Sequence, residues 1–469
     1  MKINLEDLLK LRGCEIIHPE KIETVHFNGV SIDSRSCKKK DLFFAIKGER
    51  FDGHNFLEGV YKRGVEAAVV SKKWFRKSRR DGNKITDKLA FILVDDTISS
   101  LGELAANYRD KFVIPVLAVG GSNGKTTNKD LIAHVLSKKY KVLKTEKNFN
   151  NNIGVPLTLF KLNKDYDFCV IETGTNHFGE VAELCSISNP QFGVITNIGR
   201  EHLEFFKNLR GVVKAEFELV DYLKRNYGMF FWNKDDGILE KSFRPEKIKW
   251  FSYGQRKDPD VIGKLRKFNT FYSEIEIKYR NTSISTKLNM IGLQSFNAGL
   301  CAAAIGFYFD VPAGRIKDAL SEFNPCSGGR NDLKKIEGSW IIDDTYNSNP
   351  DSVHLALENL KHYRTRGKKH IVLADMLELG KSSISEHKNI GRLVKQMGFD
   401  NLYTYGNESY NTYMGAKGMK NNFYFSEKDT IIEFLKLNLK PDDIVLVKGS
   451  RGMKMEEVIN ALYKEAQYT

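Results

Sequence analysis

Short apolar runs alternate with amphipathic stretches along the middle of the chain, which is the pattern of a sheet covered by helices. An apolar run over residues 112–119 leads into a glycine-rich turn, and a helix is expected to begin near Lys125. Further strands are expected over residues 167–173, 193–197 and 229–232. The last two are apolar at consecutive positions, as in a parallel sheet that is buried on both faces.

The pattern changes twice toward the C-terminus. Residues 261–290 alternate polar and apolar side chains, which predicts an antiparallel insert or hairpin, and residues 298–309 are typical of a buried, alanine-rich helix. After Pro325 strands are expected over 340–344, 370–374, 401–405 and 443–448, and helices over 352–362, 385–397 and 429–437. This rhythm predicts a second doubly wound sheet.

A chain of 469 residues is too long for one core and suggests about three domains of roughly 100–200 residues each. We therefore expect an α/β protein of three domains, with boundaries near residues 111 and 324. A small mixed α/β domain would span 1–111, and a central mononucleotide-binding domain of the P-loop type would span 112–324. A Rossmann-like doubly wound domain would span 325–469.

The charge balance favours a phosphate-bearing small ligand over a nucleic acid. The 73 Lys and Arg residues outnumber the 59 Asp and Glu residues, which gives a net charge of +14. Such an excess indicates either a solvated surface or a partner with phosphates. Because the lysines are scattered and no arginine-rich tail or basic-aromatic ladder is present, we do not expect nucleic-acid binding.

Cysteine spacing and hydropathy point to a cytoplasmic protein. Neither C-x-x-C nor zinc-type spacing occurs among the six cysteines, which favours reduced thiols. The first residues carry acidic side chains inside their apolar stretch, unlike a signal peptide. No run approaches the roughly 18 apolar residues of a membrane helix. The cysteines are Cys14, Cys37, Cys169, Cys185, Cys301 and Cys326.

The glycine-rich turn reads G-G-S-N-G-K-T-T over residues 120–127. The common phosphate-loop pattern would need glycine at position 119, where this chain has Val119, so only a shorter form, G-x-x-G-K-T-T, is present. The turn still delivers backbone N–H groups to an anion at the positive end of a helix. Lys125 suits the β- and γ-phosphates, and the Thr126 hydroxyl suits Mg²⁺. The alternative is an ordinary glycine turn with a surface lysine, which the strand before it and the helix after it disfavour.

Two further residues follow predicted strands and could complete a magnesium site. Glu172 ends one strand and His202 comes shortly after the next. Both fall at strand carboxyl ends, where open α/β sheets bind ligands. Taken alone, Glu172 could instead interact with a helix dipole, and His202 could be a hydrogen-bonding loop residue. The magnesium interpretation depends on both appearing in order with Thr126 on one sheet, since Mg²⁺ prefers oxygen ligands and retains waters.

These residues, with others along nearly the whole chain, resemble the Mur ligase family. The resemblance rests on residues 33–35, 41–45, 52–54, 121–127, 148, 150–151, 153–158, 172–180, 197–199, 202–204, 330, 343–350, 375–376, 378–380, 387 and 448–451. The runs N-H-F-G-E at 176–180 and D-D-T-Y-N-S-N-P at 343–350 favour one member of the family. That member joins D-alanyl-D-alanine to UDP-N-acetylmuramoyl-tripeptide and so makes a precursor of the bacterial cell wall.

The resemblance implies a role for each domain and a set of site residues. The first domain would bind the UDP end of the substrate, the second would bind ATP and Mg²⁺, and the third would close over the site and help to bind the dipeptide. The implied ATP-binding residues are Gly121, Ser122, Asn123, Gly124, Lys125, Thr126, Thr127, Asn297, Arg330 and Asp344. The implied substrate-binding residues are Ser34, Arg35, Asn150, Asn151, Tyr346, Asn347 and Lys448.

The implied chemistry is amide-bond formation through an acyl phosphate. ATP would phosphorylate the peptide carboxylate, and the dipeptide amine would then displace phosphate. Lys125, His202 and Arg330 are the implied catalytic residues, and they act by aligning groups and neutralising charge. We expect a cytoplasmic, monomeric enzyme with no membrane segment.

One departure from the family concerns the magnesium site. The family usually has a lysine, carbamylated by CO₂, at the position that Glu216 occupies here. Lys214 lies two residues away, about 200° around a helix, and cannot simply substitute for it. Our hypothesis is that Glu216 supplies a carboxylate to a second Mg²⁺ without CO₂. The alternative is that Glu216 is only a solvated helix residue.

A second departure lies before the alanine-rich helix, where the chain reads Gly292-Leu293-Gln294-Ser295. The family has an asparagine in this segment that is thought to help seat the nucleotide. Ser295, which we align with it, is shorter and makes fewer hydrogen bonds. The sequence therefore predicts weaker nucleotide contacts at this position.

Three other functions fit parts of the sequence. A sister enzyme, such as another amino-acid-adding Mur ligase or a folylpolyglutamate synthase, would share the mechanism, but residues 33–35 favour a UDP-muramoyl substrate. A basic P-loop ATPase would hydrolyse ATP in response to nucleic acid. A degenerate binding protein is conceivable because of Glu216 and Ser295, but the retained phosphate-loop and strand-end residues argue against it.

Overall fold

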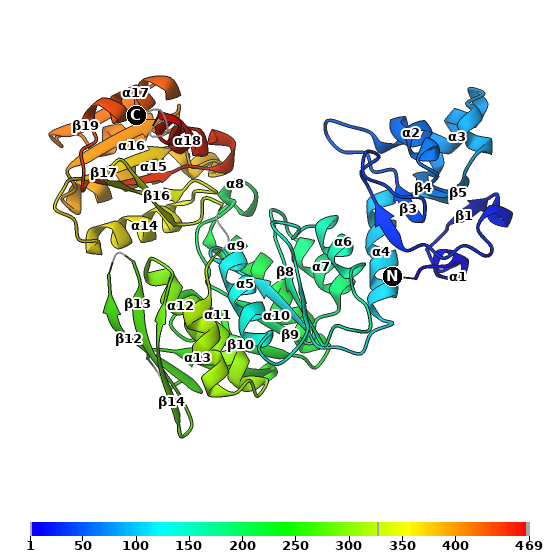
Figure 1. Cartoon of the computed structure of the whole chain (residues 1–469), viewed down its shortest axis with the longest axis horizontal. Coiled ribbons are helices and arrows are strands. Elements are labelled where there is room, and N and C mark those ends of the chain that lie inside the picture. Colours follow the sequence, from blue (N-terminus) through cyan, green and yellow to red (C-terminus); the bar gives the residue numbers. More distant parts are fainter. Residues whose placement is uncertain (1, 257, 270, 326–327, 466–469) are drawn as a thin grey trace.

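The computed structural model describes residues 2–256, 258–269, 271–325 and 328–465, and it contains three sheets. Figure 1 shows three domains, each formed around one sheet, with the C-terminal domain at the upper left and the N-terminal domain at the upper right of the central domain. The α/β class and the three-domain organisation are therefore confirmed. No helix in the described part of the chain is long and apolar enough to cross a membrane.

The N-terminal domain has a five-stranded sheet in the order β1-β5-β4-β3-β2, in which only the β1–β5 pair is antiparallel. Its strands are β1 (Glu15–Ile17), β2 (Gly29–Ser31), β3 (Asp41–Phe44), β4 (Ala67–Ser71) and β5 (Ala90–Val94). Its helices are α1 (Leu5–Leu9), α2 (Leu57–Lys62), α3 (Lys72–Arg80) and α4 (Thr97–Arg109).

The central domain has a nine-stranded sheet in the order β14-β13-β12-β11-β10-β9-β6-β8-β7. Its strands are β6 (Val116–Gly120), β7 (Val142–Lys144), β8 (Phe168–Glu172), β9 (Phe192–Ile195), β10 (Met229–Asn233), β11 (Lys249–Gly254), β12 (Val261–Phe268), β13 (Ser273–Tyr279) and β14 (Thr282–Leu288). Its helices are α5 (Lys125–Leu136), α6 (Gly154–Leu159), α7 (Glu180–Ser188), α8 (Leu203–Phe206), α9 (Leu209–Glu216), α10 (Glu218–Arg225), α11 (Gly237–Ser242), α12 (Leu293–Tyr308) and α13 (Ala313–Glu322).

The predicted antiparallel insert extends this central sheet. Strands β12, β13 and β14 pair in an antiparallel meander, and β12 joins β11 in parallel. The run predicted over residues 112–119 becomes a strand only at Val116. Pro115 precedes it and has no N–H to give to a neighbouring strand. The alanine-rich helix is longer than expected, because α12 already begins at Leu293.

The C-terminal domain has a six-stranded sheet in the order β15-β16-β20-β17-β18-β19, parallel except for the β15–β16 pair. Its strands are β15 (Asp332–Ile336), β16 (Ser339–Asp344), β17 (Lys369–Ala374), β18 (Asn401–Tyr405), β19 (Asn421–Phe425) and β20 (Ile444–Lys448). Its helices are α14 (Pro350–His362), α15 (Ser383–Gln396), α16 (Tyr410–Gly415), α17 (Lys428–Asn438) and α18 (Glu456–Glu465).

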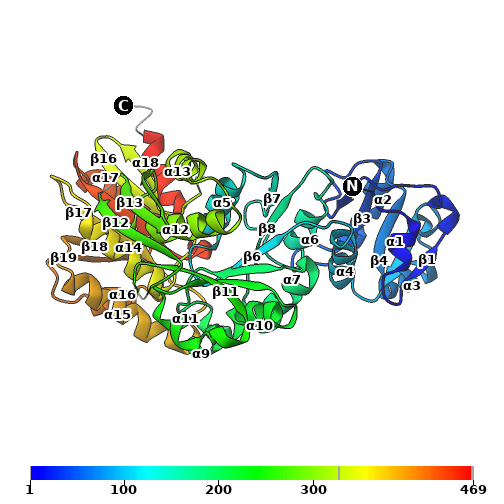
Figure 2. The same cartoon turned by 90° about the horizontal axis from the view of Figure 1, so that it is seen from below.

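Two apolar clusters cross the contacts between domains. In one, Leu101 and Leu104 of α4 pack with Leu159 and Leu184 of the central domain. Figure 2 shows α4 of the N-terminal domain beside α6 and α7 of the central domain. The other cluster joins Phe206 and Phe243 to residues of α14 and α15. The central domain therefore packs against both neighbours through continuous apolar cores.

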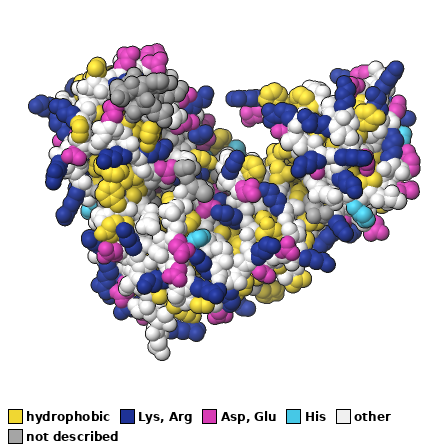
Figure 3. All heavy atoms as spheres, in the orientation of Figure 1, with side chains coloured by type: hydrophobic (Ala, Val, Ile, Leu, Met, Phe, Trp, Pro, Cys, Tyr) yellow, Lys and Arg dark blue, Asp and Glu magenta, His cyan; other side chains and the backbone are white. Residues whose placement is uncertain are grey.

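The surface shows no single basic stripe on the face drawn in Figure 3, where Lys and Arg side chains are spread among acidic ones. An open notch separates the N-terminal and C-terminal domains on the same face. The five cysteines in the described part of the chain are free, and Cys326 lies outside the described residues.

Candidate active site

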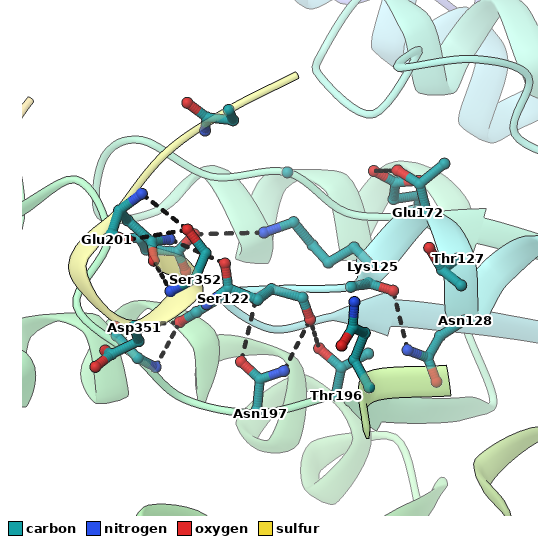
Figure 4. Close-up of a pocket in the computed structure, with 18 of the residues that line it drawn as sticks. Ser122, Lys125, Thr127, Asn128, Glu172, Thr196, Asn197, Glu201, Asp351 and Ser352 are labelled. Carbon is teal, nitrogen blue, oxygen red and sulfur yellow. Dashed lines mark hydrogen bonds and ion pairs between the residues drawn. The ribbon is translucent and has the colours of Figure 1, made fainter. Parts of the chain in front are cut away.

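A cavity of about 820 Å³ lies at the carboxyl ends of β6, β8 and β9, with the C-terminal domain forming the opposite wall. This edge of a parallel sheet is where ligands bind in open α/β folds. Figure 4 shows side chains from both domains pointing into the cavity. The lining includes the predicted residues Ser122, Asn123, Gly124, Lys125, Thr126, Thr127, Asn150, Asn151, Glu172, His202, Asn297, Arg330, Asp344, Tyr346, Asn347 and Lys448.

The phosphate loop connects β6 to α5 and needs two glycines in the left-handed region. Gly121 has φ +114°, and a Cβ there would lie 2.3 Å from the Thr196 hydroxyl oxygen. Gly124 has φ +77° and precedes the first residue of α5. The Ser122 and Asn123 N–H groups donate to Asn197, at 2.9 and 3.1 Å. The first N–H groups of α5 have no partner within the helix, so they can bind an anion.

Lys125 extends from the start of α5 across the cavity floor toward Glu201 (Figure 4). Its ammonium lies 3.6 Å from the Glu201 carboxylate and donates to the Gly121 carbonyl oxygen. Burial alone would lower the pKa of Lys125, but Glu201, Glu216 and Glu172 outweigh it and raise that pKa. The lysine is therefore a fixed positive charge beside the phosphate loop.

Glu172 and Thr126 form the second part of the site. The Thr126 hydroxyl donates to Glu172 Oε1 at 3.1 Å, and Asn150 Nδ2 donates to the same oxygen at 2.9 Å. The buried Lys129 ammonium lies 3.8 Å from Glu172 Oε2. Within the described residues, Glu172 Oε2 accepts no hydrogen bond although it is buried. A buried carboxylate oxygen of this kind suits a cation.

Glu216 lies beneath the phosphate loop, as part of the same charged cluster. Its Oε2 accepts a hydrogen bond of 2.6 Å from the Gly121 N–H, and its Oε1 is buried without a hydrogen-bond donor among the described residues. Burial raises the pKa of Glu216 to about 8, although the attraction of Lys125 opposes the shift. Glu216 is thus no solvated helix residue. Lys214, in contrast, is exposed, and its ammonium lies 5.2 Å from the centre of the Phe178 ring.

His202 contacts the C-terminal domain. Its Nδ1 is paired with the Glu378 carboxylate, and its Nε2 lies 3.9 Å from Glu201 Oε2. In the part of the chain that the structure describes, no three His, Cys, Asp or Glu side chains are grouped closely enough to hold a metal by themselves. Because Mg²⁺ usually takes only one or two carboxylates together with phosphate oxygens and water, the residues present still fit it.

The wall from the C-terminal domain carries five predicted residues, in two contacting groups. Lys448 is 2% exposed, and its ammonium donates to Asp344 at 2.7 Å and to the Asn347 carbonyl oxygen at 2.8 Å. The Arg330 guanidinium stacks on the Tyr346 ring, 3.6 Å from its centre. Stacking of this kind holds a guanidinium in place while leaving its N–H groups free to donate.

The start of α12 corrects one sequence-based expectation. Ser295 does not line the cavity; it is buried, and its hydroxyl donates to the Gly292 carbonyl oxygen at 2.6 Å. Gln294 and Asn297 line the cavity instead, and Gln294 Oε1 also accepts a hydrogen bond from Asn359. Gln294 therefore occupies the place that the sequence argument gave to Ser295.

Four predicted residues do not line the cavity. Gly121 and Glu216 lie just behind its wall, as described above. Ser34 and Arg35 belong to the N-terminal domain. The Arg35 side chain is 87% exposed and binds both carboxylate oxygens of Asp33, at 2.9 and 2.8 Å. The hydrogen bond to Arg35 lowers the pKa of Asp33 to about 2.

Sequence reasoning missed Glu201, Asn349 and Asp351, all of which line the cavity. Glu201 had the same signal as Glu172, because it is an acidic residue just beyond a predicted strand. The Asn349 amide donates to Asn123 Oδ1 at 2.9 Å, across the contact between two domains. No sequence pattern could show that contact, because it depends on how the domains dock.

Family models match three parts of the chain. They are the Mur ligase family catalytic domain over residues 26–109, the Mur ligase middle domain over 119–306, and the Mur ligase glutamate ligase domain over 329–451. A curated relative from Bacillus subtilis (strain 168), UDP-N-acetylmuramoyl-tripeptide–D-alanyl-D-alanine ligase, is 31% identical over 472 residues and covers 98% of each chain.

Two solved structures have the same architecture over nearly the whole chain. A crystal structure of MurF from Acinetobacter baumannii superposes with a TM-score of 0.87 at 26% identity, covering 99% of both chains. A MurF ligase from Thermotoga maritima, crystallised in complex with ADP, has a TM-score of 0.81 at 26% identity and covers 94% of this chain and 98% of its own. These similarities extend over all three sheets.

Proposed function

This chain belongs to the Mur ligase family, and on that premise we propose that it uses ATP to join D-alanyl-D-alanine to UDP-N-acetylmuramoyl-tripeptide. The product would be the UDP-linked pentapeptide precursor of peptidoglycan. The observation that carries the proposal is one cavity in which a phosphate loop with Lys125 faces Arg330 and Lys448 of another domain. Full-length similarity to a ligase of that name supports the choice within the family.

The chemistry follows from the poor leaving group of a carboxylate. Transfer of the γ-phosphoryl group to a carboxylate oxygen forms an acyl phosphate, and the dipeptide amine then attacks the carbonyl carbon as phosphate departs. Lys125 and Arg330 would bind the phosphoryl oxygens and offset the charge that moves between them. Closure by the C-terminal domain would exclude water, which otherwise hydrolyses the acyl phosphate.

The domains would divide the substrates between them. We propose that residues 1–111 bind the UDP end through Ser34 and Arg35, that 112–324 bind ATP, and that 325–469 close over the nucleotide and bind the dipeptide. Asp344 would contact the ribose, and Asn297 the nucleotide. Asn150, Asn151, Tyr346, Asn347 and Lys448 would contact the peptide substrates. The chain would act as a monomer in the cytoplasm.

Magnesium fits the residues that surround the phosphate loop. Thr126, Glu172 and His202 would hold it, with Glu216 nearby, and the buried carboxylate oxygens without hydrogen-bond donors support this set. When bound, Mg²⁺ would neutralise charge on the β- and γ-phosphates. In the structure, the Lys129 ammonium lies 3.8 Å from Glu172, and the Lys125 ammonium lies 3.6 Å from Glu201.

Glu216 leads to a specific prediction about CO₂. Because Glu216 places a carboxyl group under the phosphate loop without any reaction with CO₂, turnover should be unchanged when CO₂ and bicarbonate are removed from the assay. The Glu216→Lys variant should lose activity in CO₂-free buffer and recover part of it with bicarbonate. Strong loss in the unsubstituted enzyme on depletion, with rescue by bicarbonate, would contradict the hypothesis.

The function is tested by measuring ADP release while omitting each substrate in turn. The ligase requires UDP-N-acetylmuramoyl-tripeptide and D-alanyl-D-alanine together for sustained release. A nucleic-acid-dependent ATPase would instead respond to added DNA or RNA without either peptide substrate. ADP release that ignores the peptide substrates would refute the proposed function.

A further inference from the structure

The loop between β9 and α8 reaches across to the C-terminal domain. Most of the hydrogen bonds from this loop to that domain are made by Arg200. The Arg200 backbone N–H donates to Asp351 Oδ2 at 2.5 Å, and its side chain donates to Asp351 Oδ1 at 3.1 and 2.5 Å. The remaining guanidinium nitrogen donates to both oxygens of Glu386, at 3.3 and 3.0 Å. One side chain therefore joins two helices of the neighbouring domain.

The position of the two acceptors makes this contact directional. Asp351 lies in the first turn of α14 and Glu386 in the first turn of α15. Carboxylates are stabilised at helix N-termini, which favours the charged form of both side chains where they face Arg200. Arginine binds carboxylates through paired, planar hydrogen bonds, which fix orientation as well as distance. Glu386 is largely buried, with a side-chain exposure of 14%, which limits screening by solvent.

The same loop is bonded to the phosphate loop on its other side. The Gly199 N–H donates to the Ser122 hydroxyl at 2.8 Å, and that hydroxyl lies 3.2 Å from the Gly199 carbonyl oxygen. A second connection runs in parallel from Asn123 to Asn349, two residues before Asp351. Figure 4 shows Asp351 and Ser122 on the same side of the cavity. Short hydrogen-bonded steps therefore connect the phosphate loop to α14 and α15.

We propose that Arg200 is a positioning residue that fastens the C-terminal domain to the phosphate loop, so that Arg330 and Lys448 face the bound nucleotide. Arg200 itself does not line the cavity, and so it would act through Asp351 and Glu386. Its predicted effect on turnover rests on the proposed function, whereas its effect on domain docking needs only nucleotide binding.

The first test compares Arg200→Ala with Arg210→Ala, a nearby exposed arginine on α9. We expect the KM for ATP to rise roughly tenfold in Arg200→Ala, a loss comparable to one charged hydrogen-bonded contact, with a smaller change in kcat. Arg210→Ala should behave as the unsubstituted enzyme does. Equal KM values in Arg200→Ala and the unsubstituted enzyme would overturn the proposal.

The second test measures docking without catalysis. Small-angle X-ray scattering of the full chain with saturating ADP should give a larger radius of gyration for Arg200→Ala than for the unsubstituted chain. The exchange variant Arg200→Glu with Glu386→Arg should recover part of the compact state, whereas Arg200→Glu alone should not. If all four chains scatter alike with ADP, the proposal is wrong, even where the peptide-dependent assay succeeds. If only that assay fails, the proposed function is wrong and the fastening role stands.

Discussion

At the scale of single residues, the site is a cluster of buried acidic and basic side chains that stabilise one another. Glu172, Glu201 and Glu216 are each less than 5% exposed, and they surround Lys125 and Lys129. Burying a charge is costly unless a partner of opposite charge is close. Removal of one member of the cluster therefore leaves the others buried without a partner. The cluster therefore both positions the phosphate loop and depends on it.

Replacing Lys125 with alanine should reduce peptide-dependent ADP release at least about 100-fold, because the variant loses the fixed positive charge that stabilises the transferring phosphoryl group. The measurement is kcat at saturating substrates. Lys164→Ala, at an exposed position, is the matched control and should retain full activity. Turnover of Lys125→Ala close to that of the control would exclude the proposed role.

Buried histidines predict a loss of stability in acid. His387 is 1% exposed, its Nε2 accepts from the Met376 N–H, and its Nδ1 lies 2.9 Å from the Ser383 carbonyl oxygen. Burial lowers the pKa of His387 below the ordinary value of 6.5, and burial does the same at His370. The unfolded chain then binds more protons, so stability is retained above about pH 6.5 and lost as pH falls below it.

Urea unfolding followed by circular dichroism at pH 7.5 and pH 5.5 checks this expectation. The unfolding midpoint should be lower at pH 5.5, and the difference should shrink in His387→Gln, which cannot take up the proton. An equal or larger pH dependence in that variant would show that His387 does not contribute in this way.

At the scale of elements, the sequence predicted helices and strands with a clear local pattern, but it did not predict two strands at the edges of the C-terminal sheet. A pattern of contiguous residues predicted the phosphate loop, α5 and the strand that ends at Glu172. The structure places all three where the pattern predicts. The edge strands β15 and β19 were not predicted, because their side chains are mostly half-buried and show no clean alternation. The correction at Ser295 has a different origin, which is the register of a helix. Once α12 begins at Leu293, positions 294, 297 and 298 share one face, and 295 faces away.

The turn before α5 predicts a strong effect of one methyl group. Gly121→Ala would place Cβ against Thr196 in a backbone conformation that alanine rarely adopts, so the loop must shift. ADP affinity measured by calorimetry should fall by at least about tenfold, given a cost of one or more kcal/mol. Gly237→Ala, at the start of α11 with open space around it, is the control. Equal affinities in the two variants would argue against a required glycine geometry.

At the scale of the whole molecule, function depends on docking that the sequence does not encode locally. The number and class of domains follow from chain length and from the two separate α/β rhythms. The contacts that complete the site do not, because they join residues more than 140 positions apart, such as Arg200 with Asp351 and Asn123 with Asn349. Stacking of Arg330 on Tyr346 is equally dependent on the tertiary fold. The contacts between domains therefore could not be predicted from the sequence.

The most direct test of acyl-phosphate formation follows one oxygen atom. UDP-N-acetylmuramoyl-tripeptide labelled with ¹⁸O in its terminal carboxylate is incubated with ATP, D-alanyl-D-alanine and the enzyme, and the released phosphate is analysed by mass spectrometry. If the carboxylate is phosphorylated before the amine attacks, each phosphate released by ligation carries one ¹⁸O from the peptide. Release of unlabelled phosphate alongside the ligated product would contradict the account.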